Sequence, residues 1–316
     1  QDGRFKISFE GKEIDFRVSI LPVTYGGKIV LRALDKSSLS IGLDKLGFLP
    51  RPLSTFKAAL ARPYGLILVT GPTGSGKSTP LYSIITQINT PDKNIVTLED
   101  PVEYEVEGIT QIQAKPDIGL TFASGLKSVL RQSPDIVMVG EIRDFETADI
   151  SIKASLTGQL ILSTLHTNDA AGAITRLIDM GVEPFLVASS LVLSSAQRLM
   201  RKICSACREE IDIPKNVLEK AGVILDEATK DSGGHFYKGK GCPRCNNTGY
   251  RGRFGILEAL LIDDSVRDMI MKKSSSDDIK DYAIKEQHML TLRDNAMENF
   301  ISGVTTLEEV LRATAK

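Results

Sequence analysis

Apolar and polar side chains alternate along the first part of the chain, from residue 4 to residue 34. A period of two is typical of β-strands that turn one face to a core. Gly11 and the pair Gly26-Gly27 interrupt the alternation, so we expect three antiparallel strands joined by turns. Glycines, serines and two prolines then gather between residues 37 and 52, which is typical of a linker.

The pattern changes after residue 53, where short apolar runs alternate with stretches of helical period. The expected strands are 66–70, 95–98, 136–139 and 160–164, and the expected helices are 81–88, 122–130, 147–156 and 170–180. Strands that alternate with helices favour an α/β fold with a parallel sheet. Beyond residue 254 the pattern becomes helical, with helices expected at 265–271, 279–286 and 292–301.

A glycine-rich stretch between the first of these strands and its helix matches the phosphate-loop pattern G-x-x-x-x-G-K-[ST]. Its residues are Gly71, Pro72, Thr73, Gly74, Ser75, Gly76, Lys77 and Ser78, followed by Thr79. Glycines let successive backbone N–H groups surround an anion, and the helix N-terminus adds positive potential. Lys77 is expected to reach the β- and γ-phosphates of ATP, and the Ser78 hydroxyl to bind Mg²⁺. The alternative is a glycine-rich turn that binds nothing.

Pro80 fits this helix poorly, because proline has no N–H and disfavours helical backbone at the residue before it. We expect a loose first helical turn.

Polar clusters follow directly after three other predicted strands: Glu99 to Glu103, Glu141 to Asp144, and Thr164 to Thr167 with His166. In open parallel sheets, ligand sites form beyond the carboxyl ends of the strands. Phosphoryl transfer needs oxygen ligands for Mg²⁺ and a carboxylate that orients the attacking water. We assign that role to Glu141, with Glu99 and Glu103 sharing the Mg²⁺ and water network. His166 either senses the γ-phosphate or is a structural residue, and the pattern leaves both open.

The four cysteines of the chain form two C-x-x-C pairs, Cys204 with Cys207 and Cys242 with Cys245. Two such pairs are typical of a Cys₄ zinc site. Disulfides are the competing interpretation, and they are rare in nucleotide-binding proteins inside cells. The stretch between the pairs is rich in glycine and poor in apolar residues, apart from a helix-like segment at 216–221, so we expect the zinc to be structural.

The composition of the chain is that of an ordinary globular protein. Its 316 residues are 42% hydrophobic and 25% charged, which suits two domains, and no apolar stretch is long enough to span a membrane. The formal net charge of −1 gives no electrostatic footprint for nucleic acid, so no nucleic-acid partner is expected. Because the chain opens at Gln1 without Met, we expect it to be part of a longer protein.

Taken together, these motifs resemble the ATPases of type II secretion and type IV pilus assembly along nearly the whole chain. Residues 98–103 resemble the family's aspartate box, 140–144 its atypical Walker B motif, 158–168 its histidine box, and 249–253, Gly-Tyr-Arg-Gly-Arg, a further family motif. The resemblance implies a homohexameric cytoplasmic motor that hydrolyses ATP, held at the inner membrane by platform and adaptor proteins. Its fold would be a RecA-like core preceded by a small α+β (PAS-like) domain.

The resemblance also implies domain boundaries. Residues 1–36 would be the C-terminal part of the small domain, 37–52 the linker, 53–203 the RecA-like core, 204–253 the tetracysteine zinc subdomain and 254–316 a C-terminal helical region.

Four arginines gain a role from the resemblance. Arg17 and Arg32 lie in the strands of the small domain, where the pattern alone favours solvated edge residues. The resemblance makes them phosphate-contacting arginines, with Arg131 and Arg143 as further candidates.

The chain departs from the family pattern at several positions. Gln159 stands where a first histidine is frequent, Lys127 where an arginine is common, Gly27 for a glutamate and Pro80 for a threonine. Lys127 cannot make the bidentate phosphate contact that an arginine makes. None of these departures removes a group that ATP hydrolysis requires.

Three other functions stay open. A pilus-retraction motor resembles the same core but lacks the four cysteines, a nucleic-acid-translocating motor is disfavoured by the near-neutral charge, and a scaffold would bind ATP without turnover. Lys77, Ser78 and Glu141 argue against the scaffold. Secretion and pilus extension are not separated by these residues.

Overall fold

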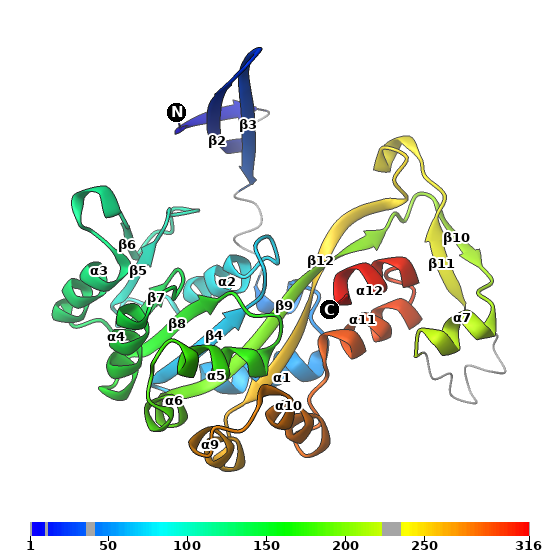
Figure 1. Cartoon of the computed structure of the whole chain (residues 1–316). Coiled ribbons are helices and arrows are strands. Elements are labelled where there is room, and N and C mark those ends of the chain that lie inside the picture. The colour runs from blue at the N-terminus through cyan, green and yellow to red at the C-terminus, as the bar shows by residue number, and fades with distance from the viewer. Residues whose placement is uncertain (1, 10–11, 36–41, 223–234, 316) are drawn as a thin grey trace.

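A computed structural model describes residues 2–9, 12–35, 42–222 and 235–315 of the chain. Three parts are visible in Figure 1: a small N-terminal sheet, a central α/β body and a lobe that projects from the end of two long strands. Within these residues, no helix is long and apolar enough to cross a membrane.

The N-terminal sheet is the antiparallel meander that the alternating pattern predicts. It consists of β1 (Asp2–Phe9), β2 (Lys12–Val23) and β3 (Gly26–Asp35), paired in the order β1-β2-β3. Phe5 of β1 lies opposite Phe16 of β2, and their rings stack with centroids 5.1 Å apart. Arg17 of β2 lies opposite Arg32 of β3.

The central sheet has seven strands in the order β12-β9-β4-β8-β7-β5-β6 (Figure 1). Their bounds are β4 Gly65–Thr70, β5 Ile95–Glu99, β6 Thr110–Gln113, β7 Ile136–Val139, β8 Leu160–Leu165, β9 Leu191–Ile203 and β12 Tyr250–Leu261. All neighbours are parallel except β12, which runs antiparallel to β9. The predicted parallel α/β core is therefore confirmed.

Helices cover both faces of this sheet, which explains why its inner strands are apolar without alternation. The α-helices of the described residues, with α7 in the projecting lobe, are α1 (Pro50–Leu60), α2 (Ser78–Ile88), α3 (Phe122–Val129), α4 (Phe145–Leu156), α5 (Ala170–Asp179), α6 (Pro184–Ser190), α7 (Lys215–Lys220), α9 (Asp264–Met271), α10 (Ser276–Lys285), α11 (Leu292–Ile301) and α12 (Leu307–Thr314). Alternate residues of β4 belong to two cores: Leu66 and Leu68 pack with α3 to α6, and Ile67 and Val69 pack with α1 and α2.

Two expectations differ from the structure. Pro80 does not loosen the first turn, because α2 begins at Ser78 and the first N–H groups of a helix have no intrahelical acceptor in any case. The strands β9 and β12 were not predicted. β9 hides from pattern analysis because it buries hydroxyl groups as well as apolar side chains: Ser194 donates to the Ala170 carbonyl at 2.7 Å and Ser195 to the Leu68 carbonyl at 2.9 Å.

The projecting lobe grows from the far ends of β9 and β12. It holds the antiparallel pair β10 (Arg208–Ile211) and β11 (Phe236–Gly239) together with α7. Gly239 and Gly249 approach so closely that a Cβ on Gly239 would lie 2.1 Å from the Gly249 carbonyl oxygen. Both positions therefore require glycine.

An ion-pair cluster fastens β9 to the C-terminal helices. Glu309 of α12 is fully buried and accepts hydrogen bonds from the Arg201 backbone N–H at 2.8 Å and from the guanidinium groups of Arg201 and Arg312 at 2.6 to 2.9 Å. Burial alone raises the pKa of Glu309, but the hydrogen bonds from Arg312 and Arg201 outweigh it and lower the pKa to about 2.

Replacing Glu309 by Gln tests how much this ion-pair cluster contributes to the free energy of unfolding. We expect Glu309→Gln to lower the free energy of unfolding by about 2 kcal/mol at pH 7, less than for a fully buried pair because both arginine side chains are about half exposed. The native pKa lies below the ordinary value near 4.5, so the stabilisation is complete above that value and disappears as pH falls from 4.5 toward 2. Urea unfolding of both proteins at several pH values measures this, and a difference independent of pH would contradict it.

Candidate functional site

The predicted phosphate loop joins β4 to α2 at the carboxyl edge of the central sheet. Its first glycine, Gly71, has φ of +146°, and a Cβ there would lie 2.6 Å from the Gln197 carbonyl oxygen and 2.5 Å from the Ser75 hydroxyl. Gly76 has φ of +82°, in the left-handed region. The loop therefore needs glycine at both positions, and the strand–loop–helix context expected from the sequence is confirmed.

Lys77 is buried and bends back over the loop. Its Nζ donates to the carbonyl oxygens of Gly71 at 2.7 Å and Pro72 at 3.1 Å. Burial lowers the pKa of Lys77; the negative charge of Glu141 opposes this shift and the positive charge of Arg198 adds to it. The ammonium group is thus a desolvated cation that an anion in the loop would stabilise.

Glu141 follows β7 and meets two other polar residues of the same edge. His166, which follows β8, places its Nε2 3.1 Å from a Glu141 carboxylate oxygen, and Arg143 forms an ion pair with the other oxygen. These two motifs come together because β7 and β8 are neighbours and run parallel. Glu141 raises the pKa of Arg143, chiefly through the hydrogen bond between the two side chains and also through its negative charge.

Glu99 ends β5 and is buried among donors of its own. It accepts hydrogen bonds from the Tyr82 hydroxyl, from the Thr97 hydroxyl at 2.6 Å and from the Gln111 amide at 3.3 Å. Burial, and then the charge of Glu99, raise the pKa of Tyr82. These contacts fix Glu99 in place, and its part in the Mg²⁺ and water network stays a prediction, as does that of Glu103.

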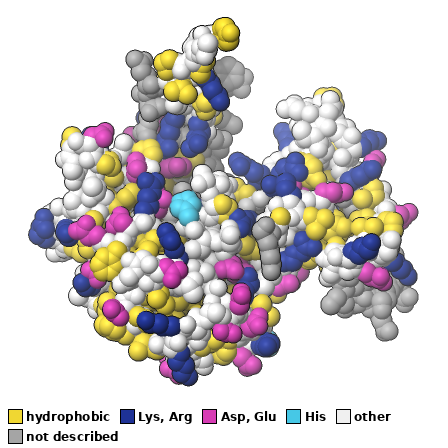
Figure 2. Space-filling model, viewed as in Figure 1, with side chains coloured by type: hydrophobic (Ala, Val, Ile, Leu, Met, Phe, Trp, Pro, Cys, Tyr) yellow, Lys and Arg dark blue, Asp and Glu magenta, His cyan; other side chains and the backbone are white. Residues whose placement is uncertain are grey.

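The N-terminal sheet touches this edge through Arg17. One Arg17 guanidinium nitrogen lies 3.3 Å from the Val102 carbonyl oxygen and another 3.8 Å from the Glu103 carboxylate, both in the segment after β5. The Nε of Arg17 is buried without a partner among the described residues. Arg32, opposite Arg17 in the sheet, is exposed. Figure 2 shows basic side chains gathered where the N-terminal sheet faces the central body.

Arg131 lies elsewhere. It belongs to the short 3₁₀ helix η4 (Leu130–Gln132), which precedes β7, and its guanidinium donates to the Lys127 carbonyl at 3.0 Å and the Ser128 hydroxyl at 3.2 Å. Because Glu141 follows the same strand that η4 precedes, Arg131 is at the opposite edge of the sheet from the phosphate loop. The structure brings Arg17 and Arg143, but not Arg131, to the carboxyl edge.

Two residues of β9 complete the site and were missed by the sequence analysis. Gln197 donates from its amide Nε2 to the carbonyl oxygens of Ser75 at 3.1 Å and Gly76 at 3.0 Å. Arg198 donates to the Asn168 side-chain oxygen at 3.2 Å, and burial lowers its pKa although Asp169 and Glu258 oppose the shift. No local motif marks them, because their position depends on β9 pairing with β4.

The four cysteines, far apart in sequence, form one cluster at the base of the lobe. Their sulfur atoms all lie within 4.8 Å of one another, with Cys204–Cys242, Cys207–Cys245 and Cys242–Cys245 separations of 3.9, 3.8 and 3.7 Å. A tetrahedral ion with bonds of about 2.3 Å places its sulfur ligands about 3.8 Å apart, whereas a disulfide needs about 2.05 Å. The geometry fits a bound metal ion and not two disulfides.

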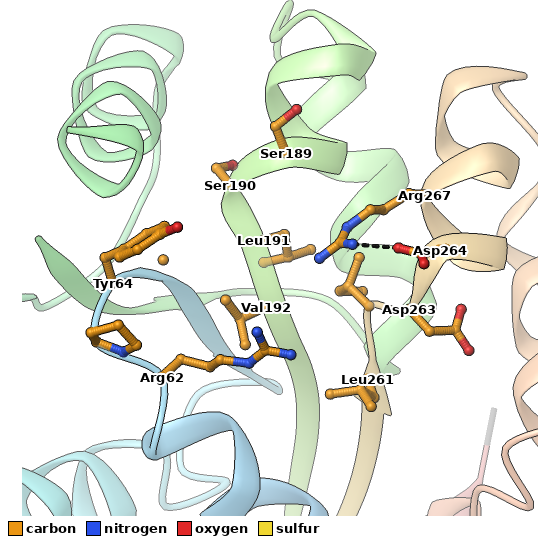
Figure 3. Close-up of a pocket in the computed structure, with 13 residues that line it drawn as sticks. Arg62, Tyr64, Ser189, Ser190, Leu191, Val192, Leu261, Asp263, Asp264 and Arg267 are labelled. Atoms are coloured by element: carbon orange, nitrogen blue, oxygen red, sulfur yellow. Dashed lines mark hydrogen bonds and ion pairs between the residues drawn. The ribbon is translucent and has the colours of Figure 1, made fainter. Parts of the chain in front are cut away.

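A cleft of about 460 Å³ opens at the opposite edge of the sheet, where β4 and β9 begin (Figure 3). Arg62 and Arg267 extend toward it from opposite sides, and Arg267 pairs with Asp264 at 2.6 Å. Gly65, the first residue of β4, lines the cleft, so the length of β4 separates it from the phosphate loop.

Comparison with known proteins places this site in a family context. Residues 1–312 match the family model described as Type II/IV secretion system protein. The chain is 51% identical to the "Type IV pilus assembly ATPase PilB" of Myxococcus xanthus, covering 100% of this chain and 55% of that protein. It is 45% identical to the "Type II secretion system ATPase E" of Vibrio cholerae, covering 99% of this chain and 61% of that protein. The chain thus spans little more than half the length of these relatives.

Among solved structures, the chain is similar to one titled "Crystal Structure of the Pilus Retraction Motor PilT and Bound ADP". The similarity has a TM-score of 0.69 at 27% identity and covers 100% of this chain and 78% of that one. The ATPase DotB of Yersinia pseudotuberculosis shares the fold, with a TM-score of 0.71 at 20% identity over 99% of this chain and 75% of that one.

Proposed function

This chain belongs to the type II/IV secretion system protein family, and we propose that it is the motor part of an ATPase that powers assembly of a type II secretion pseudopilus or extension of a type IV pilus. The observation that carries the proposal is the pairing of a phosphate loop with Glu141 at one sheet edge, with Lys77 buried between loop carbonyls within the electrostatic reach of Glu141. Relatives named as pilus assembly and secretion ATPases support it.

The residues of the site would have different roles in ATP hydrolysis. The loop N–H groups and Lys77 would hold the β- and γ-phosphates, and the ammonium group would stay charged because phosphate opposes the effect of burial on its pKa. Glu141 would orient the attacking water, with His166 fixing the rotamer of the carboxylate from 3.1 Å.

Magnesium fits the donors that this edge offers. The Ser78 hydroxyl at the first turn of α2 and the Glu141 carboxylate are hard oxygen ligands of the kind that Mg²⁺ prefers. When bound, the ion would neutralise charge that develops on the transferred phosphoryl group.

The small N-terminal sheet would supply further positive charge. Arg17 already reaches the segment after β5, where its guanidinium lies 3.3 Å from the Val102 carbonyl oxygen. Arg32 is exposed beside it, which suits contact with a nucleotide held by another subunit of a homohexamer. Arg131 lies at the far edge, away from the phosphate loop of its own chain. We therefore propose that it contacts phosphate only on a nucleotide held by a neighbouring subunit.

Zinc is the ion that we propose for the four cysteines. Four thiolates in a tetrahedral arrangement with no open position are typical of structural zinc, so the ion would hold the lobe together and take no part in hydrolysis. We further propose a cytoplasmic protein that reaches the inner membrane through platform and adaptor proteins. A pilus-retraction motor is the second candidate because of the fold shared with PilT, but the four cysteines favour assembly or secretion.

ATP turnover tests the function directly. We expect Glu141→Gln to retain ATP and lower kcat by at least 10³-fold, because the amide keeps the size of the carboxylate but cannot order water in the same way. Lys77→Ala should lose both binding and turnover. Steady-state ATPase assays with equilibrium ATP binding measure both, with and without DNA to address a nucleic-acid motor. An ATP-binding chain without turnover in the unmodified protein would favour a scaffold instead.

Arginine variants test the role of the N-terminal sheet. Arg17→Ala and Arg32→Ala should each lower kcat by about 10³-fold or more while changing ATP affinity much less, and lysine should substitute poorly because it lacks the planar fork of the guanidinium. Arg62→Ala, in the cleft at the far edge, is the matched control. Reduced thermal stability with unchanged kcat per folded molecule would show that the two arginines only brace the sheet.

Metal analysis tests the cysteine cluster. Protein purified without added metal should contain about one zinc per chain, and Cys204→Ser together with Cys245→Ser should remove it and lower the melting temperature. Elemental analysis by mass spectrometry and thermal unfolding check both. Metal-free protein with an unchanged melting temperature would refute the assignment.

A further inference from the structure

Gln197 holds the phosphate loop by two hydrogen bonds that no loop motif includes. It lies on β9, the strand next to β4, and the residue is 2% exposed. The amide Nε2 donates to two successive loop carbonyls, Ser75 at 3.1 Å and Gly76 at 3.0 Å. The orientation of the amide follows from these partners, because a carbonyl oxygen in place of Nε2 would face two other acceptors.

The geometry of the peptide group turns these contacts into a functional constraint. In a trans peptide the C=O and the N–H point in nearly opposite directions. Holding the Ser75 carbonyl toward β9 therefore directs the Gly76 N–H away from β9, and holding the Gly76 carbonyl does the same for the Lys77 N–H. Within the described part of the chain, neither N–H has a protein acceptor. Both are left as donors for an anion.

Burying the Gln197 side chain costs more free energy than burying an apolar side chain would. Its Oε1 is buried without a partner among the described residues, which costs free energy that an apolar side chain of similar size would not incur. The same residue also meets the start of the loop, since its backbone carbonyl oxygen would lie 2.6 Å from a Cβ on Gly71. One residue of β9 thus contacts both ends of the loop.

We propose that Gln197 is a positioning residue that orients the Gly76 and Lys77 N–H groups toward the β-phosphate of a bound nucleotide. The inference rests on the proposed function, since it needs a nucleotide in the loop. Preorganised donors spare the loop the entropy of ordering itself around the phosphate, so the loss of Gln197 should weaken binding rather than only lower stability.

The test compares two variants of the same strand. Gln197→Met keeps the length of the side chain and removes the donor, whereas Ser195→Ala removes a buried hydrogen bond to the Leu68 carbonyl, on the same face of β9 but away from the loop. We expect Gln197→Met to raise the Kd for Mg²⁺-ADP by at least about tenfold, the worth of about one hydrogen bond, and Ser195→Ala to leave it within about threefold.

A second readout separates positioning from folding. The ratio of the Kd for AMP to the Kd for ADP should fall by the same factor in Gln197→Met, since AMP has no β-phosphate. General damage to the fold would instead weaken the binding of both nucleotides alike. If Gln197→Met does not fold, Gln197→Asn, which keeps the amide but shortens its reach, should show the same loss.

The outcomes are distinct. Absence of ADP binding by the unmodified chain would overturn the proposed function. Normal ADP binding by the unmodified chain, with the same affinity in the Gln197 variants or an equal loss in Ser195→Ala, would overturn the positioning role alone.

Discussion

Donors without acceptors at the carboxyl edge of the central sheet are the constraint on which the site depends. The Lys77 ammonium group finds two loop carbonyls, whereas the N–H groups of Gly76 and Lys77 have no acceptor in the described chain. The Nε atoms of Arg17 and Arg198 are likewise buried without partners among the described residues. A donor buried without an acceptor costs free energy, and an anion held in the phosphate loop would supply acceptors to the N–H groups of the loop. Glu141 adds negative charge near Lys77, which opposes the effect of burial on the pKa of that ammonium group.

Much of this arrangement could be predicted from the sequence, because each part of it is local. A phosphate loop needs only its glycines, Lys77 and the strand and helix beside it, and Glu141 and His166 are marked by the apolar strands that precede them. What brings Glu141 to His166 is strand order: β7 pairs with β8, and parallel strands end at one edge. The spacing of the cysteines predicts one cluster, and strand order explains it: Cys204 follows the end of β9, Cys242 and Cys245 precede β12, and these two strands pair antiparallel.

The remaining features depend on tertiary contacts that no local pattern carries. Gln197 became part of the site only because β9 pairs with β4, and β9 escaped prediction because its buried serines bond across to other elements. Glu99 belongs to a recognisable motif, but its hydrogen bond from the Tyr82 hydroxyl could not be predicted, because Tyr82 lies in the preceding helix, α2. Arg131 shows the converse: a resemblance names the residue, yet its helix precedes β7 and so places it at the opposite edge.

β9 connects features that the sequence presents as separate. Gln197 touches the phosphate loop, Arg201 binds Glu309 of α12, and Cys204 follows the last residue of the strand. Gln197 and Cys204 are seven positions apart, so at about 3.3 Å per residue the extended chain places Cys204 at most about 23 Å from Gln197, which touches the loop. The Cys204 N–H donates to the Gly249 carbonyl at 2.9 Å, just before β12 begins. An ion held by Cys204, Cys242 and Cys245 would therefore close the open end of the β9–β12 pair. The lobe also packs on α11: the rings of Phe236 and Phe300 stack with centroids 4.8 Å apart, and Arg293 donates to the Ala221 carbonyl at 3.0 Å. Its orientation relative to the phosphate loop is therefore set by the β9–β12 pair together with these contacts to α11.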